Sequence, residues 1–165
     1  MRRLTLIRHA KSSWDDPALP DFERPLNARG ERDAPEMARR LAAQLERPLK
    51  LISSPAVRAR ATAEAFAAAL GLKPGVIAFE PRLYETRADL LLRLVRALDD
   101  ADAHVVLVGH NPALSKLART LADCPFDELP TCAVATLRFD VPRWREVKPG
   151  RGTLERYRYP KESTR

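Results

Sequence analysis

The sequence predicts an α/β fold, a three-layer α/β/α sandwich around a mainly parallel sheet with an antiparallel C-terminal portion. Short apolar runs typical of buried strands occur at residues 4–7, 49–52 and 104–108. Segments with apolar residues at helical spacing lie between them. Each run ends in polar or charged residues. In open α/β sheets ligands bind just beyond the carboxyl ends of the strands, so we expect a binding site at that edge.

The first strand ends in an arginine and a histidine. Residues 4–7 run directly into Arg8 and His9, with Lys11 and Ser12 close behind. Charged residues at the end of a buried strand require a partner or a ligand. Lys11 and Ser12 are candidates for contacts with substrate oxygens, and for Lys11 the role of a solvated loop cation is equally open.

A long polar stretch with three prolines follows at residues 11–27. We expect an ordered loop over the site, because Trp14, Leu19 and Phe22 give this stretch apolar side chains that can pack.

Apolar residues recur at helical spacing over residues 34–45, and Pro35 predicts that this helix begins or kinks near that position. The second strand follows at residues 49–53. Behind it, Ser54 is expected to cap the next helix, with Pro55 at the first helical position.

The helix after the second strand carries Arg58 in its first turn and is expected to end at Gly71. A helix N-terminus carries about half a positive charge, so Arg58 would reinforce an anion site there. Taken alone, Arg58 has the character of an ordinary surface arginine, like Arg60 beside it.

A short strand at residues 76–79 and a helix at residues 90–98 lead to the fourth strand at residues 104–108. That strand begins with His104 and is followed by a glycine and His110. We therefore expect His110 at the binding edge of the sheet. His104 lies at the opposite end, as a structural or surface residue.

The C-terminal part of the chain is predicted to add antiparallel strands. Asn111 is expected to cap a helix that has Pro112 at its first position. Strands are predicted at residues 133–139, 144–147 and 154–159, and their close spacing does not require helical crossovers.

Length and composition predict one domain over residues 1–160 and a flexible tail at residues 161–165. The 29 basic and 22 acidic residues give a net charge of +7. These charges are interleaved without a basic block, so we expect no specific binding of nucleic acid. No apolar run approaches the length of a membrane span. Two cysteines without CxxC spacing indicate a reducing compartment, and we expect a cytoplasmic protein that does not associate with membranes.

Two arginines and two histidines at one sheet edge form a cage for a dianion. Guanidinium groups of Arg8 and Arg58 can pair with phosphate oxygens. One neutral imidazole can attack phosphorus, while a second histidine, His9 and His110 being the two available, can donate a hydrogen bond to the phosphate oxygens. Three histidines without carboxylates at ligand spacing do not make a zinc site, so we expect no metal and no cofactor.

Three short motifs at these spacings resemble the histidine phosphatase superfamily. They are Arg8-His9, Ser53-Ser54-Pro55 through Arg58, and Gly109-His110. The run at residues 8–14, with residues 24–27 and Gly30 after it, is similar to the compact SixA-type phosphohistidine phosphatase branch. The resemblance spans nearly the whole chain, although Ala10 stands where the superfamily most often has glycine.

The resemblance implies two-step phosphoryl transfer in which His9 is the nucleophile and Arg8, Arg58 and His110 bind the phosphate oxygens. The implied enzyme is a metal-independent phosphatase that hydrolyses phosphohistidine or phosphomonoesters, so its partner is a phosphorylated protein or a small phosphorylated molecule. The alternatives are a general small-molecule phosphomonoesterase, and a phosphate- or phosphoprotein-binding module with little turnover.

The general acid is the open position in this scheme. Larger members of the superfamily use a carboxylate after the third strand, where Glu85 is the first positional match and Asp89 the second. Glu85 is equally compatible with a solvated position before a helix. A missing acid would favour P–N substrates, because a protonated imidazole leaves far more readily than an alkoxide.

Overall fold

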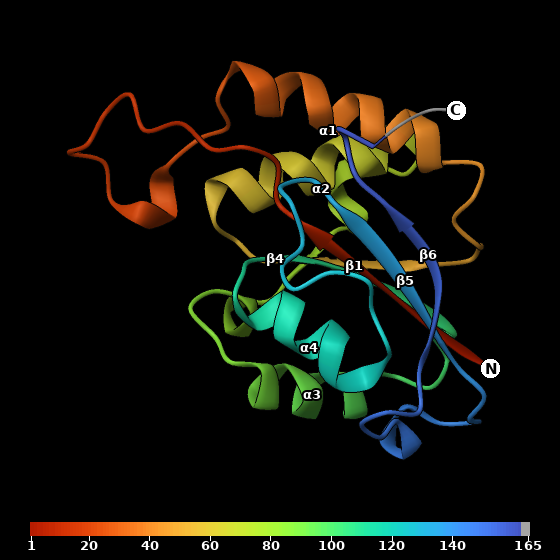
Figure 1. The fold of residues 1–165 in the computed structure, drawn as a ribbon. Coiled ribbons are helices and arrows are strands. Elements are labelled where there is room, and N and C mark those ends of the chain that lie inside the picture. Colours follow the sequence, from red (N-terminus) through yellow and green to blue (C-terminus); the bar gives the residue numbers. More distant parts are fainter. Residues whose placement is uncertain (163–165) are drawn as a thin grey trace.

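Figure 1 shows the computed structural model of the chain, which describes residues 1–162. Within them, six strands form one mixed sheet in the order β3-β2-β4-β1-β5-β6. The strands are β1 (Arg2–Arg8), β2 (Lys50–Ser53), β3 (Ala78–Phe79), β4 (His104–Gly109), β5 (Val134–Phe139) and β6 (Thr153–Arg158). The first four pair in parallel, whereas β5 pairs antiparallel with both β1 and β6. The predicted sheet, mainly parallel with an antiparallel C-terminal portion, is confirmed.

Helices cover both faces of the sheet (Figure 1). They are α1 (Ala28–Leu41), α2 (Val57–Ala69), α3 (Ala88–Arg96) and α4 (Ala113–Leu121). The first two pack on one face through a cluster that includes Met37 and Phe66, and the last two on the other face through Leu91 and Leu117. Because both faces are covered, β4 is buried along its whole length. The three-layer sandwich is confirmed.

The carboxyl ends of β1, β2 and β4 coincide at one edge of the sheet. In register, Arg8 lies beside Gly109 and Ser53 lies beside Val108. The residues that follow these strands therefore emerge together, which is where a ligand site is expected.

The first helix begins earlier than predicted. α1 starts at Ala28 and is capped by Asn27, whose side chain accepts a hydrogen bond from the backbone N–H of Gly30 at 2.8 Å. Pro35 lies inside the helix, so a start near Pro35 is wrong. A helix of 14 residues with a strong N-cap and a packed face retains its other bonds despite the one that proline removes.

The two caps predicted for α2 and α4 are also wrong. The N-cap residues are an alanine and a proline, which offer no side-chain acceptor. Ser54 and Asn111 lie before these positions, and their side chains bond to His110 and to the carbonyl of Leu129 instead. The predicted helix end is correct, because Gly71 follows α2 with a φ of 70°.

One of the three C-terminal strands is not a strand. Residues 133–139 and 154–159 correspond to β5 and β6, but residues 144–147 lie mostly in a 3₁₀ turn, Trp144–Glu146. Trp144 is fully buried, and its indole donates to the carbonyl of Asp102 at 2.8 Å. Burial of this large side chain against α3 fixes a turn at the position where the sequence predicted a strand.

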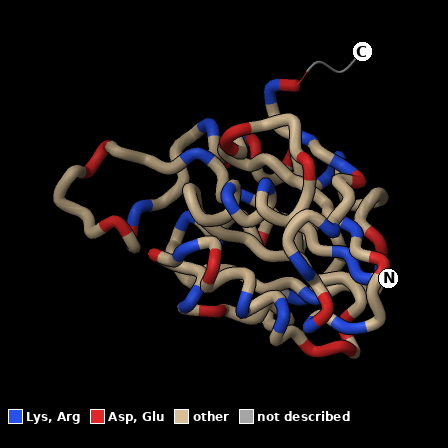
Figure 2. Tube along the Cα trace, turned by 60° about the horizontal axis from the view of Figure 1, so that its bottom comes forward, with Lys and Arg blue, Asp and Glu red and all other residues tan. Residues whose placement is uncertain are grey.

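The remaining surface carries mixed charge. Basic and acidic residues are interleaved along the chain (Figure 2). Glu162, in the predicted tail at residues 161–165, accepts a hydrogen bond from Arg40 of α1 at 2.8 Å; residues 163–165 lie outside the described residues. Among the helices that the structure describes, none has the length and hydropathy needed to cross a bilayer.

Candidate active site

His9 follows β1 directly and is held through its backbone and its ring. Its N–H donates to the carbonyl of Gly109 at 3.1 Å, and ring Nδ1 lies 2.7 Å from the carbonyl of Ala10. A carbonyl can only accept, so Nδ1 carries the proton and Nε2 keeps the lone pair of a neutral ring. The residue is only 7% exposed.

The ring of His9 is neutral at physiological pH. Burial is the main cause that lowers the pKa of His9 to about 3, although the hydrogen bond to Ala10 opposes this effect. The nearby charges of His110, Arg58 and Arg8 lower the pKa further. The Nε2 lone pair is therefore available without removal of a proton.

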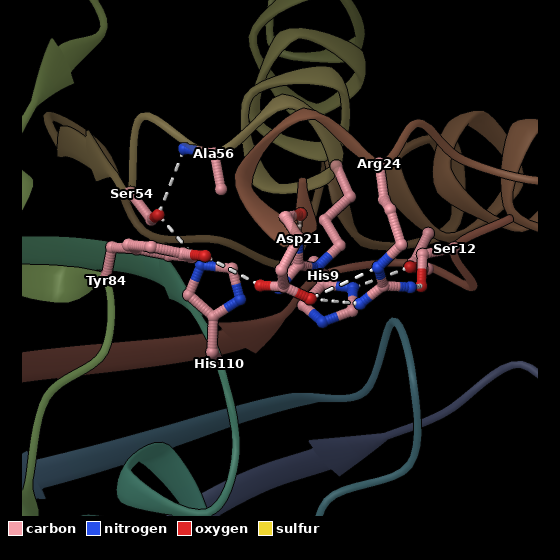
Figure 3. Close-up of polar contacts among 10 residues, drawn as sticks. His9, Ser12, Asp21, Arg24, Ser54, Ala56, Tyr84 and His110 are labelled. Atoms are coloured by element: carbon pink, nitrogen blue, oxygen red, sulfur yellow. Dashed lines mark hydrogen bonds and ion pairs between the residues drawn. The ribbon is translucent and has the colours of Figure 1, made fainter. Parts of the chain in front are cut away.

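His110 lies beside His9, with 5.1 Å between the ring centroids. Its Nε2 is 2.8 Å from Ser54 Oγ, which also accepts the N–H of Ala56 at 3.2 Å (Figure 3). Within the described residues Ser54 Oγ has no other hydrogen-bond partner, so Nε2 of His110 is the one acceptor for its hydroxyl proton, and we assign Ser54 as the donor to Nε2. The proton of His110 is then on Nδ1.

That Nδ1–H has no protein acceptor. The Nδ1 atom of His110 is buried, and within residues 1–162 it has no hydrogen-bond partner. Burial first, and then the charge of Arg58, lowers the pKa of His110 to about 4, so the ring is neutral. His110 therefore offers one hydrogen-bond donor to a ligand.

Arg58 is placed by the first turn of α2. Thr62 fixes this turn to the end of β1, because its Oγ1 donates to the carbonyl of Arg58 at 2.8 Å and accepts the N–H of Ala10 at 3.0 Å. The Arg58 side chain is 6% exposed. Thr62 thus connects α2 with the residues that follow β1.

Arg8 is the last residue of β1 and is anchored by a backbone carbonyl. Its Nη1 donates to the carbonyl of Leu129 at 2.8 Å, and Asn111 donates to the same carbonyl at 2.9 Å. The Nε atoms of Arg8 and Arg58 are buried and, within the described part of the chain, have no hydrogen-bond partner. Buried cationic donors of this kind require an anion.

These side chains line one cavity of about 360 Å³. It brings together the four residues of the predicted dianion cage, Arg8, His9, Arg58 and His110. The two further candidates for substrate contacts, Lys11 and Ser12, also line it. It also includes residues that sequence reasoning missed: Trp14, Asp21, Arg24, Asn111 and Thr131. Three arginines, one lysine and one carboxylate leave an excess of positive charge, which suits a multiply charged anion.

The comparison with protein families identifies the superfamily of this chain. The model of the histidine phosphatase superfamily (branch 1) matches residues 4–89, which include Arg8, His9 and Arg58. The chain belongs to the histidine phosphatase superfamily. An uncharacterized chloroplastic protein of Arabidopsis thaliana is 32% identical over 88% of this chain and 70% of its own length.

Solved structures of the superfamily share the fold. A candidate phosphohistidine phosphatase SixA from Agrobacterium tumefaciens is 29% identical with a TM-score of 0.80, covering 96% of this chain and 98% of its own. The protein histidine phosphatase SixA in complex with tungstate has a TM-score of 0.78 at 24% identity, over 96% and 97% of the two chains. The fold of this chain is that of the SixA-like members.

The loop beside this cavity is held mainly by polar contacts, and of the three apolar side chains predicted to pack, Phe22 stands edge-on to Tyr84 with 5.1 Å between the ring centroids. Trp14 is 68% exposed and Phe22 is also exposed. Arg24 is buried instead: its guanidinium lies 3.6 Å from the centre of the Trp14 ring, and its Nη1 donates to Ser12 Oγ at 2.7 Å. Arg24 also pairs with Asp21 at 2.6 Å. A basic side chain thus organises the loop at residues 11–27.

Asp21 lines the cavity, and Tyr84 of the neighbouring cavity contacts both Asp21 and His110. The phenol of Tyr84 donates to Asp21 Oδ2 at 2.7 Å, and its ring stands edge-on to His110 with 5.4 Å between centroids. Asp21 lies in the 3₁₀ turn Asp21–Glu23 of a polar loop, where no periodic pattern marks a functional residue. The nearby Arg24-Pro25-Leu26-Asn27 motif was the available signal.

Neither predicted general acid lines the cavity with His9. Glu85 is exposed, has a φ of 50°, and lines a neighbouring cavity of about 500 Å³. Asp89 is exposed and pairs with Arg87 at 3.1 Å. The carboxylate in the site cavity is that of Asp21. Tyr84 lines the same neighbouring cavity as Glu85, but its hydroxyl reaches Asp21.

Metal ligation has no visible basis in the part of the chain that the structure describes. Residues 1–162 contain no group of three or more histidine, cysteine or acidic residues that could hold a metal ion. The positive charge of the cavity comes from Arg8, Lys11, Arg24 and Arg58.

Proposed function

We propose that this protein is a phosphatase that hydrolyses phosphohistidine through a covalent phosphohistidine intermediate on His9. The observation that carries the proposal is the state of the His9 ring. Its Nδ1 is tied to the carbonyl of Ala10, its Nε2 keeps a lone pair, and Arg8, Arg58 and His110 line the same cavity. This combination supplies a nucleophile and the cations needed for phosphoryl transfer.

In the first step, Nε2 of His9 attacks phosphorus, and the bond to the leaving group breaks with its electron pair going to that group. Arg8, Arg58 and the Nδ1–H of His110 bind the oxygens on which charge builds up. In the second step, water attacks the phosphohistidine, the P–N bond breaks, and inorganic phosphate and neutral His9 are restored.

The surroundings of His9 favour P–N over P–O substrates. Glu85 and Asp89 lie outside the cavity, and the pKa of Asp21 is held well below its usual range. Burial raises that pKa, but hydrogen bonds from Arg24, Tyr84 and Arg58 lower it by more. An imidazole that takes its proton from solvent leaves without help from such an acid, whereas an alkoxide does not.

The shape of the site suits a side chain on another protein. The cavity is about 360 Å³, and Trp14 in its lining is 68% exposed. The similarity to the Agrobacterium tumefaciens candidate phosphohistidine phosphatase supports the same substrate class. We therefore infer a phosphorylated protein as the partner, with no specific nucleic acid or membrane. The two free cysteines, Cys124 and Cys132, support a reducing, cytoplasmic location.

The test is phosphate release from a chemically phosphorylated histidine peptide and from p-nitrophenyl phosphate. We expect His9→Ala to abolish both activities, and radiolabelled substrate to leave an alkali-stable label on wild type but not on His9→Ala. A strong preference for the peptide would support the P–N assignment. A preference for small phosphomonoesters would support the general phosphomonoesterase instead, and absence of turnover with retained phosphate binding would support a binding module.

A matched pair of arginine variants controls for charge. Arg58→Ala removes a cavity residue, whereas Arg60→Ala removes an exposed arginine of the same helix that pairs with Glu64 at 3.1 Å. We expect a loss of about 10²–10³-fold in kcat for the first and little change for the second. Because Arg8 and Arg58 supply the positive charge, activity should persist in a chelator such as EDTA.

A further inference from the structure

The carboxylate of Asp21 occupies the anion-binding groups of the site. Its Oδ1 accepts hydrogen bonds from Arg24 Nε at 3.1 Å and Nη2 at 2.6 Å. Its Oδ2 accepts from Arg58 Nη2 at 2.9 Å and from the Tyr84 hydroxyl at 2.7 Å. Figure 3 shows this carboxylate between Tyr84 and Arg24, close to His9. Four donor atoms from three residues therefore converge on one internal anion.

Asp21 also takes the remaining terminal nitrogen of Arg58. Arg58 Nη1 donates to the backbone carbonyl of Asp21 at 2.6 Å. Both ends of the guanidinium fork are thus bonded to one residue. A phosphate that binds Arg58 through the same fork has to take those donors from Asp21.

The donors around Asp21 match a phosphoryl group as well as a carboxylate. Guanidinium forks bind both anions bidentately. Burial first, and then the contact with Asp21, raises the pKa of Tyr84 to about 12, so its hydroxyl remains a donor when the anion is exchanged. A dianion has twice the charge of a carboxylate, which favours its binding to two arginines.

We infer that Asp21 is an intramolecular competitor for the phosphoryl group: substrate binds by displacing its carboxylate from Arg58 and Tyr84. The inference rests on the proposed function in that the same cavity takes a phosphoryl group. Asp21 is free to move aside, because its side chain is 49% exposed and lies on a short turn in the loop at residues 11–27. In this role Asp21 sets the affinity of the site.

The alternative role of Asp21 as general acid fits the structure less well. A general acid must hold a proton before the leaving group departs. Asp21 receives four hydrogen bonds, three of them from arginine nitrogens, and these favour the ionised carboxylate. An ionised group in this position excludes an anion by repulsion and occupancy. It does not donate a proton.

The decisive measurement is the affinity for inorganic phosphate by titration calorimetry at fixed pH and salt. Asp21→Asn keeps the shape of the side chain and removes its charge. We expect phosphate to bind at least about tenfold more tightly to Asp21→Asn than to wild type, because one repulsive charge within the cavity is removed. Equal or weaker binding to Asp21→Asn, or no measurable binding to either protein, would overturn the inference.

Asp15→Asn is the matched control. Asp15 is an exposed aspartate of the same loop, and its substitution changes the net charge by the same amount outside the cavity. We expect its phosphate affinity to stay within about twofold of wild type, since an exposed charge at a distance is screened. An equal gain in Asp15→Asn would mean that net charge, not occupancy by Asp21, sets the affinity.

Kinetics separate the competitor from the general acid and from failure of the proposed function. A competitor predicts a lower KM in Asp21→Asn with kcat held within about threefold for both p-nitrophenyl phosphate and phenyl phosphate. A general acid predicts a lower kcat, with the greater loss for phenyl phosphate, whose leaving group is more basic. Phosphate binding needs no turnover, so the binding result stands independently of whether His9 forms an intermediate.

Discussion

Two histidines stand at opposite ends of the same strand, and their ring nitrogens make different contacts. His104 begins β4 and His110 follows its end. Both rings are largely buried, and burial is the first cause that lowers both pKa values. Burial and neutrality therefore do not distinguish a structural histidine from a functional one. The distinction lies in what the ring nitrogens contact.

Both nitrogens of His104 are satisfied by the protein. Nδ1 lies 2.6 Å from the carbonyl of Glu46, and Nε2 lies 2.7 Å from Thr5 Oγ1, which also bonds to Thr136. His110 has one nitrogen bonded to Ser54, while within the described residues its other nitrogen has no partner. A spare donor beside two arginines and a second histidine is the mark of a ligand site.

The largest effect should appear in turnover. We expect His110→Ala to lower kcat for phosphate release by about 10²–10³-fold, because a donor to the transition-state oxygens is lost. His104→Ala should keep kcat within about threefold, since His104 lies at the far end of β4 from the cavity. Steady-state assays on the two purified variants make the comparison. A similar loss in both would refute the division of tasks.

Stability should show the opposite order. His104→Ala leaves the carbonyl of Glu46 and the hydroxyl of Thr5 without their buried partner, at a cost of about 3 kcal/mol in the free energy of unfolding. His110→Ala breaks one hydrogen bond at the edge of an open cavity and should cost about 1 kcal/mol. Urea unfolding of the same two variants measures both values. If His110→Ala proves the less stable, His110 also has a structural role.

The pH dependence of stability sharpens the comparison further. His110 titrates at 6.5 when unfolded and at about 4 when folded. The unfolded chain therefore binds more protons between these values, and stability falls as the pH drops through this window. Between pH 7 and pH 5 His110 alone should account for a loss of about 2 kcal/mol. Urea unfolding at these two pH values should therefore show a smaller change in the free energy of unfolding for His110→Ala than for wild type. An equal change in both proteins would contradict the lowered pKa of His110.

The sequence was most informative where function coincides with the end of a strand. Apolar runs that stop at Arg8-His9 and at His110 predicted the sheet edge, and the motif around Arg58 placed a third residue there. Parallel pairing then brings these positions together without further information. The same reasoning placed His104 away from the site, because it starts its strand.

Contacts that depend on the path of a loop could not be predicted in this way. Arg58 and Tyr84 meet Asp21 across 37 and 63 residues of sequence, and no periodicity connects them. Glu85 was chosen by its position after a strand, but a residue in a turn can face either way. Pro35 shows the related limit within a helix: a local breaker is overridden when the N-cap and the packed face are strong.

The smallest effect concerns the hydroxyl of Ser54, which sets the tautomer of the His110 ring. Ser54 accepts the N–H of Ala56 and donates to Nε2 of His110, which keeps the proton on Nδ1. Ser54→Ala removes this preference, so we expect kcat to fall by about tenfold while the fold is retained. Ser53→Ala is the matched control, because Ser53 is equally buried but donates to the carbonyl of Ser54 and not to a ring.

The tautomer of His110 can be measured directly. This measurement distinguishes a loss of the hydrogen bond from Ser54 to His110 from a general loss of packing around Ser54. Nitrogen-15 NMR of labelled histidine should show His110 protonated at Nδ1 in wild type and a mixture of both tautomers in Ser54→Ala. Ser53→Ala should keep the wild-type spectrum even if its stability falls. If wild-type His110 instead carries its proton on Nε2, its ring N–H is donated to Ser54. His110 would then have no N–H to donate to a phosphate oxygen, which would contradict its assigned role.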